Sequence, residues 1–538
     1  GGGGGAGGKM SPGDRAAAEA NLTKVTGRDD DGGEYVDMFY LDAYEKNGVV
    51  YVFGKVEVPG ATGATTAKSK ANDEKRYVSA CCAVHGNLRS MYVLPRRKTK
   101  TKDGSEDGSE DGSEDGSEDG SSFFSMAEVH KELKGVLQPK VIPVREGNTW
   151  GGKVVSRKYA FSDVTVPRES TQYLKVVYSA KHGVVPEDIC KNGGESFQRI
   201  FGANTSTLEN FIVKRKLMGP SWIRVRGVKP TETSSSWCKI EFQTSSPKNV
   251  KRITESDLGD DGDLSTLVTP PVTTMTLKIK TVVNPKTQAA EIISASAICH
   301  RSVNLVGETN ATTTLHQQQA INLIRPLGDS AEIGCLGTFP HDFKQLLQSK
   351  FPTLTPCFNE RALISRLLTQ VGSWDPDVIV GHNAWGFDME VLLCRASSHK
   401  MKDWHKLGRL KKANSPFKNG RTTTNVEWAI AEAMTGRLLC DTYVSGKEFL
   451  NKEVNYTLRN LAEKQLKEDK VEIEPVDVPS YFNKSNNILV LARHTLRDAQ
   501  LVQKLAFKLQ VIPLTKQLTA IAGNLWGRTM KGNRAERT

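Results

Sequence analysis

The pattern of apolar and polar positions divides the chain into two parts with different periodicities. In the first part, which begins near Glu34, two β-rich runs at 37–45 and 49–58 are separated by three turn-forming residues and predict a hairpin. A 3.6-residue periodicity at 126–137 predicts a helix. We therefore expect a β-rich domain over residues 34–265.

From about Pro270 the pattern changes to strands followed by alternating helices and strands. This order is typical of an α/β domain with a mixed sheet, which we place at 266–510. Within it the sequence predicts strands at 273–283, 291–300, 331–339 and 436–444, and helices at 359–371, 455–466 and 486–509, the last of them broken by Pro513. The fold class expected for the whole chain is α+β and α/β.

Three segments do not follow these patterns. Residues 1–33 are rich in Gly, Ala and Asp, and we expect them to be a disordered leader. A basic run followed by a repeated Ser-Glu-Asp-Gly unit predicts a flexible loop over 96–122. The basic segment 511–538 is typical of a connector to a domain that this chain does not include.

Composition narrows the classes of partner. No apolar run approaches the roughly 20 residues that span a bilayer, and nine scattered cysteines without a C-x-x-C pair indicate a reducing interior rather than disulfides or structural zinc. The net charge is +12, although residues 103–119 contain nine acidic and no basic side chains. The rest of the chain is therefore still more basic, which indicates a polyanionic partner such as nucleic acid, with solubility alone as the alternative.

The most informative stretch is DPDVIVGHNAWGFDMEVLL, residues 375–393, where a short apolar strand ends in a polar break and a helix begins. Ligands in α/β folds bind at such junctions. Asp388 falls in the first turn of the helix, where an acid is either a cap or a metal ligand. Asp498, in a later helix, would be a second carboxylate for a two-metal site. Lys278 and Lys280, however, place two ammonium groups on one face of the first strand, where acids would be required.

Two basic clusters are candidates for contact with phosphate, with a solvated helix face as the alternative. The larger cluster includes one tryptophan and consists of Lys400, Lys402, Trp404, His405, Lys406, Arg409, Lys411 and Lys412. The smaller cluster ends a predicted helix and consists of Lys214, Arg215 and Lys216.

Several segments together resemble the family B DNA polymerases, and within them the alpha type of eukaryotic replicative polymerase. The resemblance runs from about Glu34 to Thr538. It is carried by FGANTSTLENFIVKRKLMGPSW, GHNAWGFD within residues 375–393, WHKLGRLKK, HTLRDA and IAGNLWGRTMKGNRAER.

The resemblance implies that the second domain is an RNase H-like 3′–5′ exonuclease-type domain with three motifs. The matching residues are, in motif order, Lys278 and Lys280, then Asn383, Phe387 and Asp388, then His494 and Asp498. Both acids of the first motif and the tyrosine of the third are replaced, so the resemblance implies a degenerate exonuclease that holds no metal. We further expect an ammonium group of Lys278 or Lys280 to occupy the vacated cation position beside the surviving carboxylates.

The aspartate motifs of the polymerase palm do not occur in this sequence. The resemblance therefore implies an amino-terminal part of a nuclear replicative polymerase, with no cofactor in this chain and Mg²⁺ in the missing palm. The implied partners are primer–template DNA, including an RNA–DNA primer, and other replication or primase subunits. Two alternatives stay open: an active exonuclease that uses substitute acids such as Asp441, and an interaction module that does not bind DNA.

Overall fold

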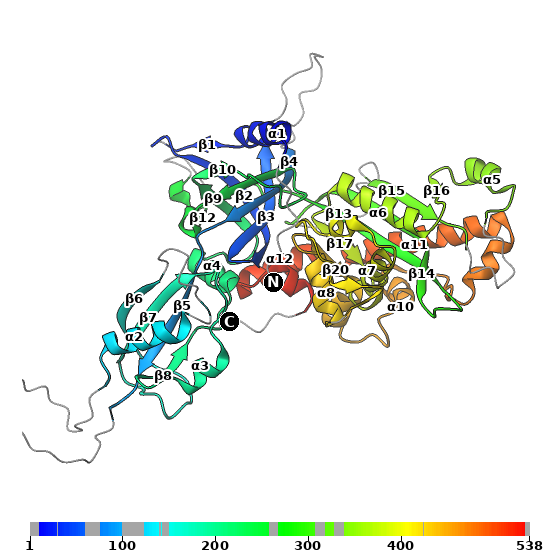
Figure 1. Cartoon of the computed structure of the whole chain (residues 1–538). Helices are drawn as coiled ribbons and strands as arrows, with labels where there is room; N and C mark the ends of the chain where they lie inside the picture. The colour runs from blue at the N-terminus through cyan, green and yellow to red at the C-terminus, as the bar shows by residue number, and fades with distance from the viewer. Residues whose placement is uncertain are drawn as a thin grey trace, which may run out of the picture.

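The computed structural model describes residues 10–29, 31–59, 76–98, 123–138, 141, 150–257, 267–306, 318–327, 338–422 and 424–532. Most of the predicted loop at 96–122 and residues 331–337 of a predicted strand lie outside these ranges. Figure 1 shows two β-rich lobes on one side of the molecule and a helix-covered sheet on the other. No helix in the described part is long and apolar enough to cross a bilayer.

The first lobe is an eight-stranded sheet built around the predicted hairpin. Its order is β10-β11-β4-β3-β2-β9-β12, with β1 paired to β2, and only β4 and β11 pair in parallel. The hairpin turn is made by Asn47 and Gly48, both with positive φ, as a tight hairpin requires. The strands are β1 (Gly27–Arg28), β2 (Glu34–Lys46), β3 (Val49–Val58), β4 (Arg76–Val84), β9 (Ser221–Arg226), β10 (Val228–Pro230), β11 (Ile240–Thr244) and β12 (Val250–Arg252).

The prediction of a wholly disordered leader is wrong for the described residues, because α1 (Pro12–Thr23) is a helix. Ser11 caps it by accepting a hydrogen bond from the Asp14 N–H, and a proline occupies the first turn. Leu22 is buried in the core of the eight-stranded sheet and fixes the helix there.

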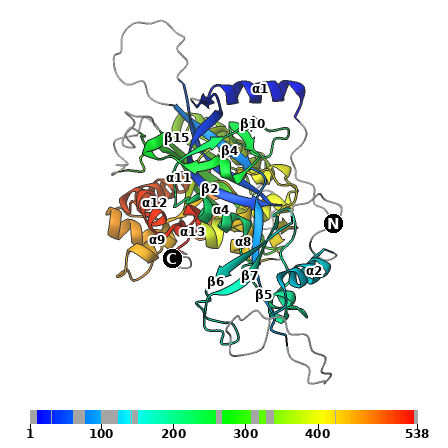
Figure 2. The same ribbon diagram turned by 90° about the vertical axis from the view of Figure 1, so that its left-hand side faces the viewer.

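The second lobe is a four-stranded antiparallel sheet, which lies below the first in Figures 1 and 2. Its order is β6-β7-β5-β8. The predicted helix is present as α2 (Met126–Leu137), begins with a capping box between Ser125 and Glu128, and buries its apolar side on the sheet. The other elements are β5 (Leu88–Pro95), β6 (Gly151–Arg157), β7 (Thr171–Ser179), β8 (Phe197–Phe201) and α3 (Glu187–Asn192), and α4 (Thr207–Arg215) lies between the two lobes.

The second half of the chain contains a six-stranded mixed sheet, as predicted. Its order is β16-β15-β14-β13-β17-β20, in which β13, β17 and β20 are parallel and β13, β14 and β15 antiparallel. Two buried clusters flank the sheet, one with α6 and α7 and one with α11. The elements are β13 (Val272–Val283), β14 (Ala290–Val303), β15 (Gln318–Ile324), β16 (Leu354–Pro356), β17 (Val378–Gly381), β20 (Leu438–Asp441), α5 (Phe343–Lys350), α6 (Glu360–Trp374), α7 (Met389–Ser398), α8 (Val426–Ala433), α9 (Thr442–Phe449), α10 (Leu458–Leu461) and α11 (Ser485–Lys508).

Two details of this half differ from the expectations. The sheet contains the strand β15 at 318–324, where none was predicted. Of the strand predicted at 331–339, residues 331–337 lie outside the described residues and residues 338–339 are not in a strand. Pro513 does not break α11, which ends at Lys508 before Gln510 turns into the left-handed region. Pro513 instead lies in the first turn of α12 (Val511–Ala522), where a missing N–H is tolerated.

Candidate functional site

The candidate site lies at the carboxyl end of β17, where the chain enters α7. Asn383 adopts a left-handed conformation with φ of 58°, and a single π-helical turn (Ala384–Asp388) leads into α7. Gly381 is required at the break, because a Cβ there would lie 2.7 Å from the Cβ of Ala384. The π-turn directs Asp388 into the interior, where its side chain is 1% exposed.

Asp388 forms an ion pair with Lys278 from the neighbouring strand β13. The Lys278 Nζ lies 2.8 Å from Asp388 Oδ2 and 3.3 Å from the carbonyl oxygen of His382. The side chain of Asp388 makes no capping hydrogen bond, and its Oδ1 has no hydrogen-bond partner among the described residues. Burial raises the pKa of Asp388, which the charge of Lys278 partly offsets. Asp388 is therefore a buried, ion-paired acid and not a helix cap.

The second lysine of the strand makes the equivalent contact with the second acid. Lys280 Nζ lies 3.6 Å from Asp498 Oδ2 and donates to the carbonyl oxygen of Ile473. A third lysine, Lys470, approaches Asp498 Oδ1 at 4.0 Å. Burial lowers the pKa of Lys280, and the charge of Asp498 opposes that shift. The expectation that an ammonium group of Lys278 or Lys280 lies beside the surviving carboxylates is confirmed, and both lysines form such a pair. The sequence did not indicate that Lys470 belongs to this site, because its segment has no helical or strand periodicity.

The remaining motif residues surround this pair of contacts. Phe387 is partly exposed, at 39%. His494 lies one helical turn from Asp498, and burial lowers its pKa while the charge of Asp498 raises it. Asn383 contributes its backbone N–H to Asp441, at 2.8 Å from Oδ1. The structure therefore brings the motif residues to one end of the sheet.

Asp441, the candidate substitute acid, already has its oxygens occupied. Oδ1 accepts hydrogen bonds from the backbone N–H groups of Asn383 and Tyr443, and Oδ2 accepts one from Trp385. The side chain is buried and caps α9. The Asp441 carboxylate therefore serves to accept hydrogen bonds from buried backbone N–H groups. It could ligate a metal ion only if these hydrogen bonds were broken.

The residues present do not fit the two divalent cations that an exonuclease of this type implies. Hard cations need several free oxygen ligands, whereas Asp388 and Asp498 each face an ammonium group. Among the residues that the structure describes, no group of three or more His, Cys, Asp or Glu side chains is arranged to hold a metal ion. The ammonium groups supply the positive charge that metal ions would otherwise provide.

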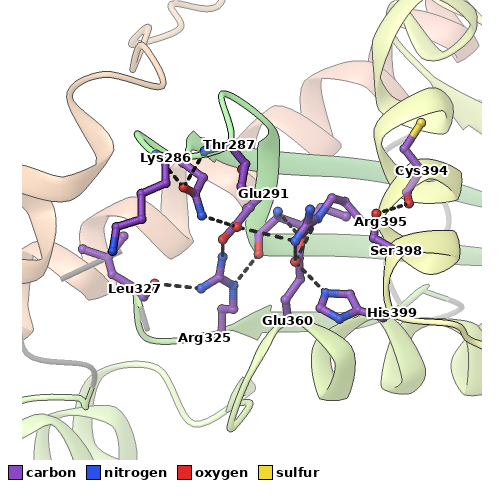
Figure 3. A network of polar contacts seen from close by, with 12 residues as sticks. Lys286, Thr287, Glu291, Arg325, Leu327, Glu360, Cys394, Arg395, Ser398 and His399 are labelled. Carbon is purple, nitrogen blue, oxygen red and sulfur yellow. Dashed lines mark hydrogen bonds and ion pairs between the residues drawn. The ribbon is translucent and has the colours of Figure 1, made fainter. Parts of the chain in front are cut away.

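A buried ionic network holds α7 against the sheet (Figure 3). Glu360, in the first turn of α6, accepts hydrogen bonds from Arg395 of α7, from His399 at the C-cap of that helix, and from the backbone N–H of Ile292 in β14. Burial alone would raise the pKa of Glu360, but the hydrogen bonds from His399 and Arg395 lower it to about 2. The network fixes the helix that carries the candidate site.

The predicted phosphate-contacting cluster is only partly on the surface. Trp404, Arg409 and Lys412 are buried, so the prediction that they face phosphate is wrong. Arg409 forms ion pairs with Asp375 and with Asp377, the latter at 2.8 Å. Lys412 binds Glu432 at 2.5 Å, and Trp404 belongs to the core of the mixed sheet. Arg409 and Lys412 thus pair with acids of their own half of the chain, and Trp404 packs in the core of that half.

The other members of the cluster remain accessible. Lys400 and Lys402 are exposed, and Lys406 and Lys411 are half-buried. The last two surround Trp237, with Nζ atoms 5.3 and 4.6 Å from its ring centroid. His405 stacks on the same ring at 5.4 Å. Trp237 is absent from the predicted cluster because it lies far away in the sequence, in a turn of the first lobe.

The smaller basic cluster lies at the end of α4. Lys216 is its left-handed C-cap, with φ of 54°, and Lys214 and Lys216 are exposed. This cluster faces the four-stranded sheet rather than the mixed sheet, because Lys214 interacts electrostatically with Lys175 of β7 and Tyr92 of β5. The two basic clusters therefore belong to different surfaces.

Comparison with known proteins agrees with this geometry. Residues 198–461 match the family model described as DNA polymerase family B, exonuclease domain. The chain is 33% identical to the DNA polymerase alpha catalytic subunit of Xenopus laevis over 96% of this chain and 32% of that protein. It is 34% identical to that of Oryza sativa subsp. japonica over 98% of this chain and 35% of the relative. The chain thus spans about a third of the length of these relatives.

The fold is similar to that of a solved polymerase. The structure of the family B DNA polymerase from the hyperthermophilic archaeon Pyrobaculum calidifontis matches with a TM-score of 0.53 and 17% identity, over 93% of this chain and 49% of the other. At this identity the likeness shows the fold alone. Together with the mixed sheet, it confirms the predicted RNase H-like architecture of the second half.

Proposed function

This chain belongs to the family B DNA polymerases, and from that premise we propose that it binds primer–template DNA as part of an alpha-type replicative polymerase while its exonuclease-type domain hydrolyses nothing. The chain matches a region of DNA polymerase alpha catalytic subunits, and that region contains the exonuclease domain. Loss of hydrolysis and contact with DNA are the two parts of the proposal.

The contact between Lys278 and Asp388 supports the loss of hydrolysis. Phosphodiester hydrolysis by this class of site uses two metal ions that activate water and stabilise the leaving oxygen. An ammonium group 2.8 Å from the carboxylate repels a divalent cation and occupies the oxygen that would bind it. Lys280 makes the corresponding contact on the other acid. Neither half of a two-metal mechanism is therefore available.

An exonuclease assay tests this part. The chain is incubated with a 3′-mismatched primer on a template, in Mg²⁺ or Mn²⁺, and release of the terminal nucleotide is followed. We expect no metal-dependent release above that of Asp388→Ala, because neither protein assembles the metal site. Metal-dependent release that disappears in Asp388→Ala would refute the proposal and favour an active exonuclease.

Contact with DNA is supported by the basic composition and by the accessible part of the larger cluster. Lys402 and Lys406 lie on the 3₁₀ helix (Lys402–Leu407) beside Trp237, so the surface offers both cations and an aromatic ring. Lys406 also pairs with Asp403 at 3.0 Å, and that pair would have to open or be shared with phosphate.

Fluorescence anisotropy with a labelled primed template, over a series of salt concentrations, tests the DNA contact. Lys402→Ala/Lys406→Ala should reduce the slope of log K against log salt by about 1.8, since each lost phosphate contact removes about 0.9. Lys131→Ala/Lys134→Ala on α2 carries the same charge change and serves as the control. Binding that does not depend on salt, or an equal effect of both variants, would favour the interaction module that does not contact DNA.

The wider setting follows the family and is proposed with it. We propose a nuclear location, replication or primase subunits as partners, and RNA–DNA primers among the nucleic acids bound. Primer extension with Mg²⁺ is proposed only for a chain that includes a palm domain. Co-purification of tagged chain with primase subunits from nuclear extract, set against the same pull-down with the α2 control variant, is the corresponding measurement.

A further inference from the structure

The face of the four-stranded sheet turned away from α2 carries a row of side chains that the proposed function does not use. The strand register places Lys153 directly opposite Lys175, Lys175 opposite Tyr92, and Tyr92 opposite Phe201. Since these residues occupy one register position on four adjacent strands, they share one face. Lys153 is exposed and the other three are half-buried.

This row concentrates positive charge, and no carboxylate among the described residues forms an ion pair with it. Like charges directly opposite each other destabilise a strand pair, yet Lys153 and Lys175 are such a pair. Arg157 of β6 and Lys175 lie over the Tyr92 ring at 5.9 and 5.7 Å. Lys214 adds its charge from the surface of α4, where partial desolvation of its ammonium group and the nearby Lys175 lower its pKa.

Asp163, an acid of the same lobe, is already engaged. It forms an ion pair with Arg199 and accepts hydrogen bonds from Thr165. Within the described ranges none of Lys153, Arg157, Lys175 and Lys214 forms an ion pair with a carboxylate. Among the described residues no carboxylate offsets the repulsion between them, and an anionic ligand would do so.

Aromatic rings continue the row at its edge. Tyr159 lies 5.5 Å from Phe201 and 5.5 Å from Phe161, measured between ring centroids. Phe161 is 75% exposed, which is unusual for a large apolar ring. Beyond them Val166 packs on Leu94 and Tyr173, so the loop that carries Phe161 is anchored beside the basic row rather than loose.

We propose that this face, made by Lys153, Lys175, Tyr92 and Phe201 with Arg157, Lys214, Tyr159 and Phe161 at its margins, binds a single-stranded nucleic acid. The lysines and the arginine contact phosphates, and the exposed rings stack on unpaired bases. Cations that follow a backbone and aromatic rings that accept any base are the two components of single-strand binding. Bases in a duplex are already stacked, so the rings favour the single strand.

The inference does not depend on the proposed primer–template surface, which lies on a different part of the chain. Photocrosslinking keeps the two distinguishable. The full chain is titrated with an oligothymidylate of about 16 nucleotides that contains 5-iododeoxyuridine. Mass spectrometry then locates the adduct, and its yield against oligonucleotide concentration gives the Kd of that site. We expect the adduct on Tyr159 or Phe161.

Lys153→Ala/Lys175→Ala should weaken this site about 25-fold at 0.1 M salt, and reduce the slope of log K against log salt by about 1.4, since each phosphate contact to a single strand contributes about 0.7. Phe161→Ala, at an exposed position that leaves the core intact, should weaken it about fivefold or more through lost stacking. The control Lys131→Ala/Lys134→Ala, on the opposite side of the sheet, should leave the Kd unchanged.

Three results would overturn the assignment. Adducts confined to other parts of the chain would place the single strand elsewhere. Equal competition by a duplex of the same length would remove the role of unpaired bases. Equal competition by polyglutamate would assign the face to acidic peptides. Unchanged circular dichroism of each variant establishes that a loss of crosslinking reflects the surface and not the fold.

Discussion

Removing the ammonium group of Lys278 is the most informative perturbation of the candidate site. In Lys278→Met the stem is kept, so the buried Asp388 loses its cation with little change in packing. At 2.8 Å and an effective dielectric constant near 20 the gross attraction is about 6 kcal/mol. Breaking a buried pair on one side costs about 3–5 kcal/mol net. The partial exposure of Lys278, 16%, favours the lower end of that range.

Protonation of Asp388 sets an upper limit on this cost. The carboxyl can take up a proton instead of staying charged, and with an unfolded pKa of 3.8 that costs about 4 kcal/mol at pH 7 and about 1.6 kcal/mol at pH 5. A carboxyl whose folded pKa is raised stabilises the fold below its unfolded pKa, and that contribution is lost as the pH rises through the folded pKa. We therefore expect Lys278→Met to destabilise the site by about 3 kcal/mol at pH 7 and by no more than about 1.6 kcal/mol at pH 5.

Hydrogen exchange is the appropriate assay, because a chain with several sheets does not unfold in one step. Exchange of peptides from β13 and α7, detected by mass spectrometry at both pH values, gives the local opening free energy. Lys251→Met, at an exposed strand position in the first lobe, is the control. Lys278→Met/Asp388→Asn should recover most of the loss. A loss below about 1 kcal/mol at pH 7, or one that grows toward pH 5, would refute the view that the lysine neutralises a buried carboxylate.

Two further predictions concern elements that support the sites. Glu360→Gln should lower the opening free energy of α7 by about 3 kcal/mol, because Arg395 loses a buried charged partner. In the parent protein the same stabilisation should be lost as the pH falls from about 4.5 through about 2, because Glu360 becomes protonated. Hydrogen exchange measured as a function of pH tests this loss. An effect confined to peptides outside α6, α7 and β14 would contradict the network in Figure 3. Ser125→Ala should destabilise α2 by about 1 kcal/mol through loss of the capping box, as measured by exchange of its first turn, whereas unchanged exchange there would show that the cap is dispensable.

Local periodicity was sufficient to predict the elements whose apolar faces are regular. The hairpin of β2 and β3, the helix α2 and the mixed sheet all follow from such patterns. The strand β15 was missed because its apolar residues occupy only its second half, and α1 was missed because only Leu22 is buried in an otherwise polar helix. In both cases the stabilising contacts come from residues distant in the sequence.

The candidate site shows the same division. The resemblance, which marks Lys278 and Lys280 as replacements for two acids on one strand face, was enough to expect neutralisation of the surviving acids by an ammonium group. Sequence proximity was misleading for Arg409, because a basic run does not reveal that one of its members is buried against the acids that precede β17. Trp237 and Lys470 could not be found at all, since each reaches its site through a loop.

The most direct test of the central claim is the location of manganese in crystals of the chain soaked with Mn²⁺, determined by anomalous diffraction. We predict no manganese coordinated by Asp388 or Asp498, because Lys278 and Lys280 already neutralise them. In Lys278→Asp/Lys280→Glu, which restores oxygen ligands on the same strand face, manganese should be present between these acids. Manganese bound by Asp388 in the parent protein, with the Lys278 ammonium displaced, would contradict the account.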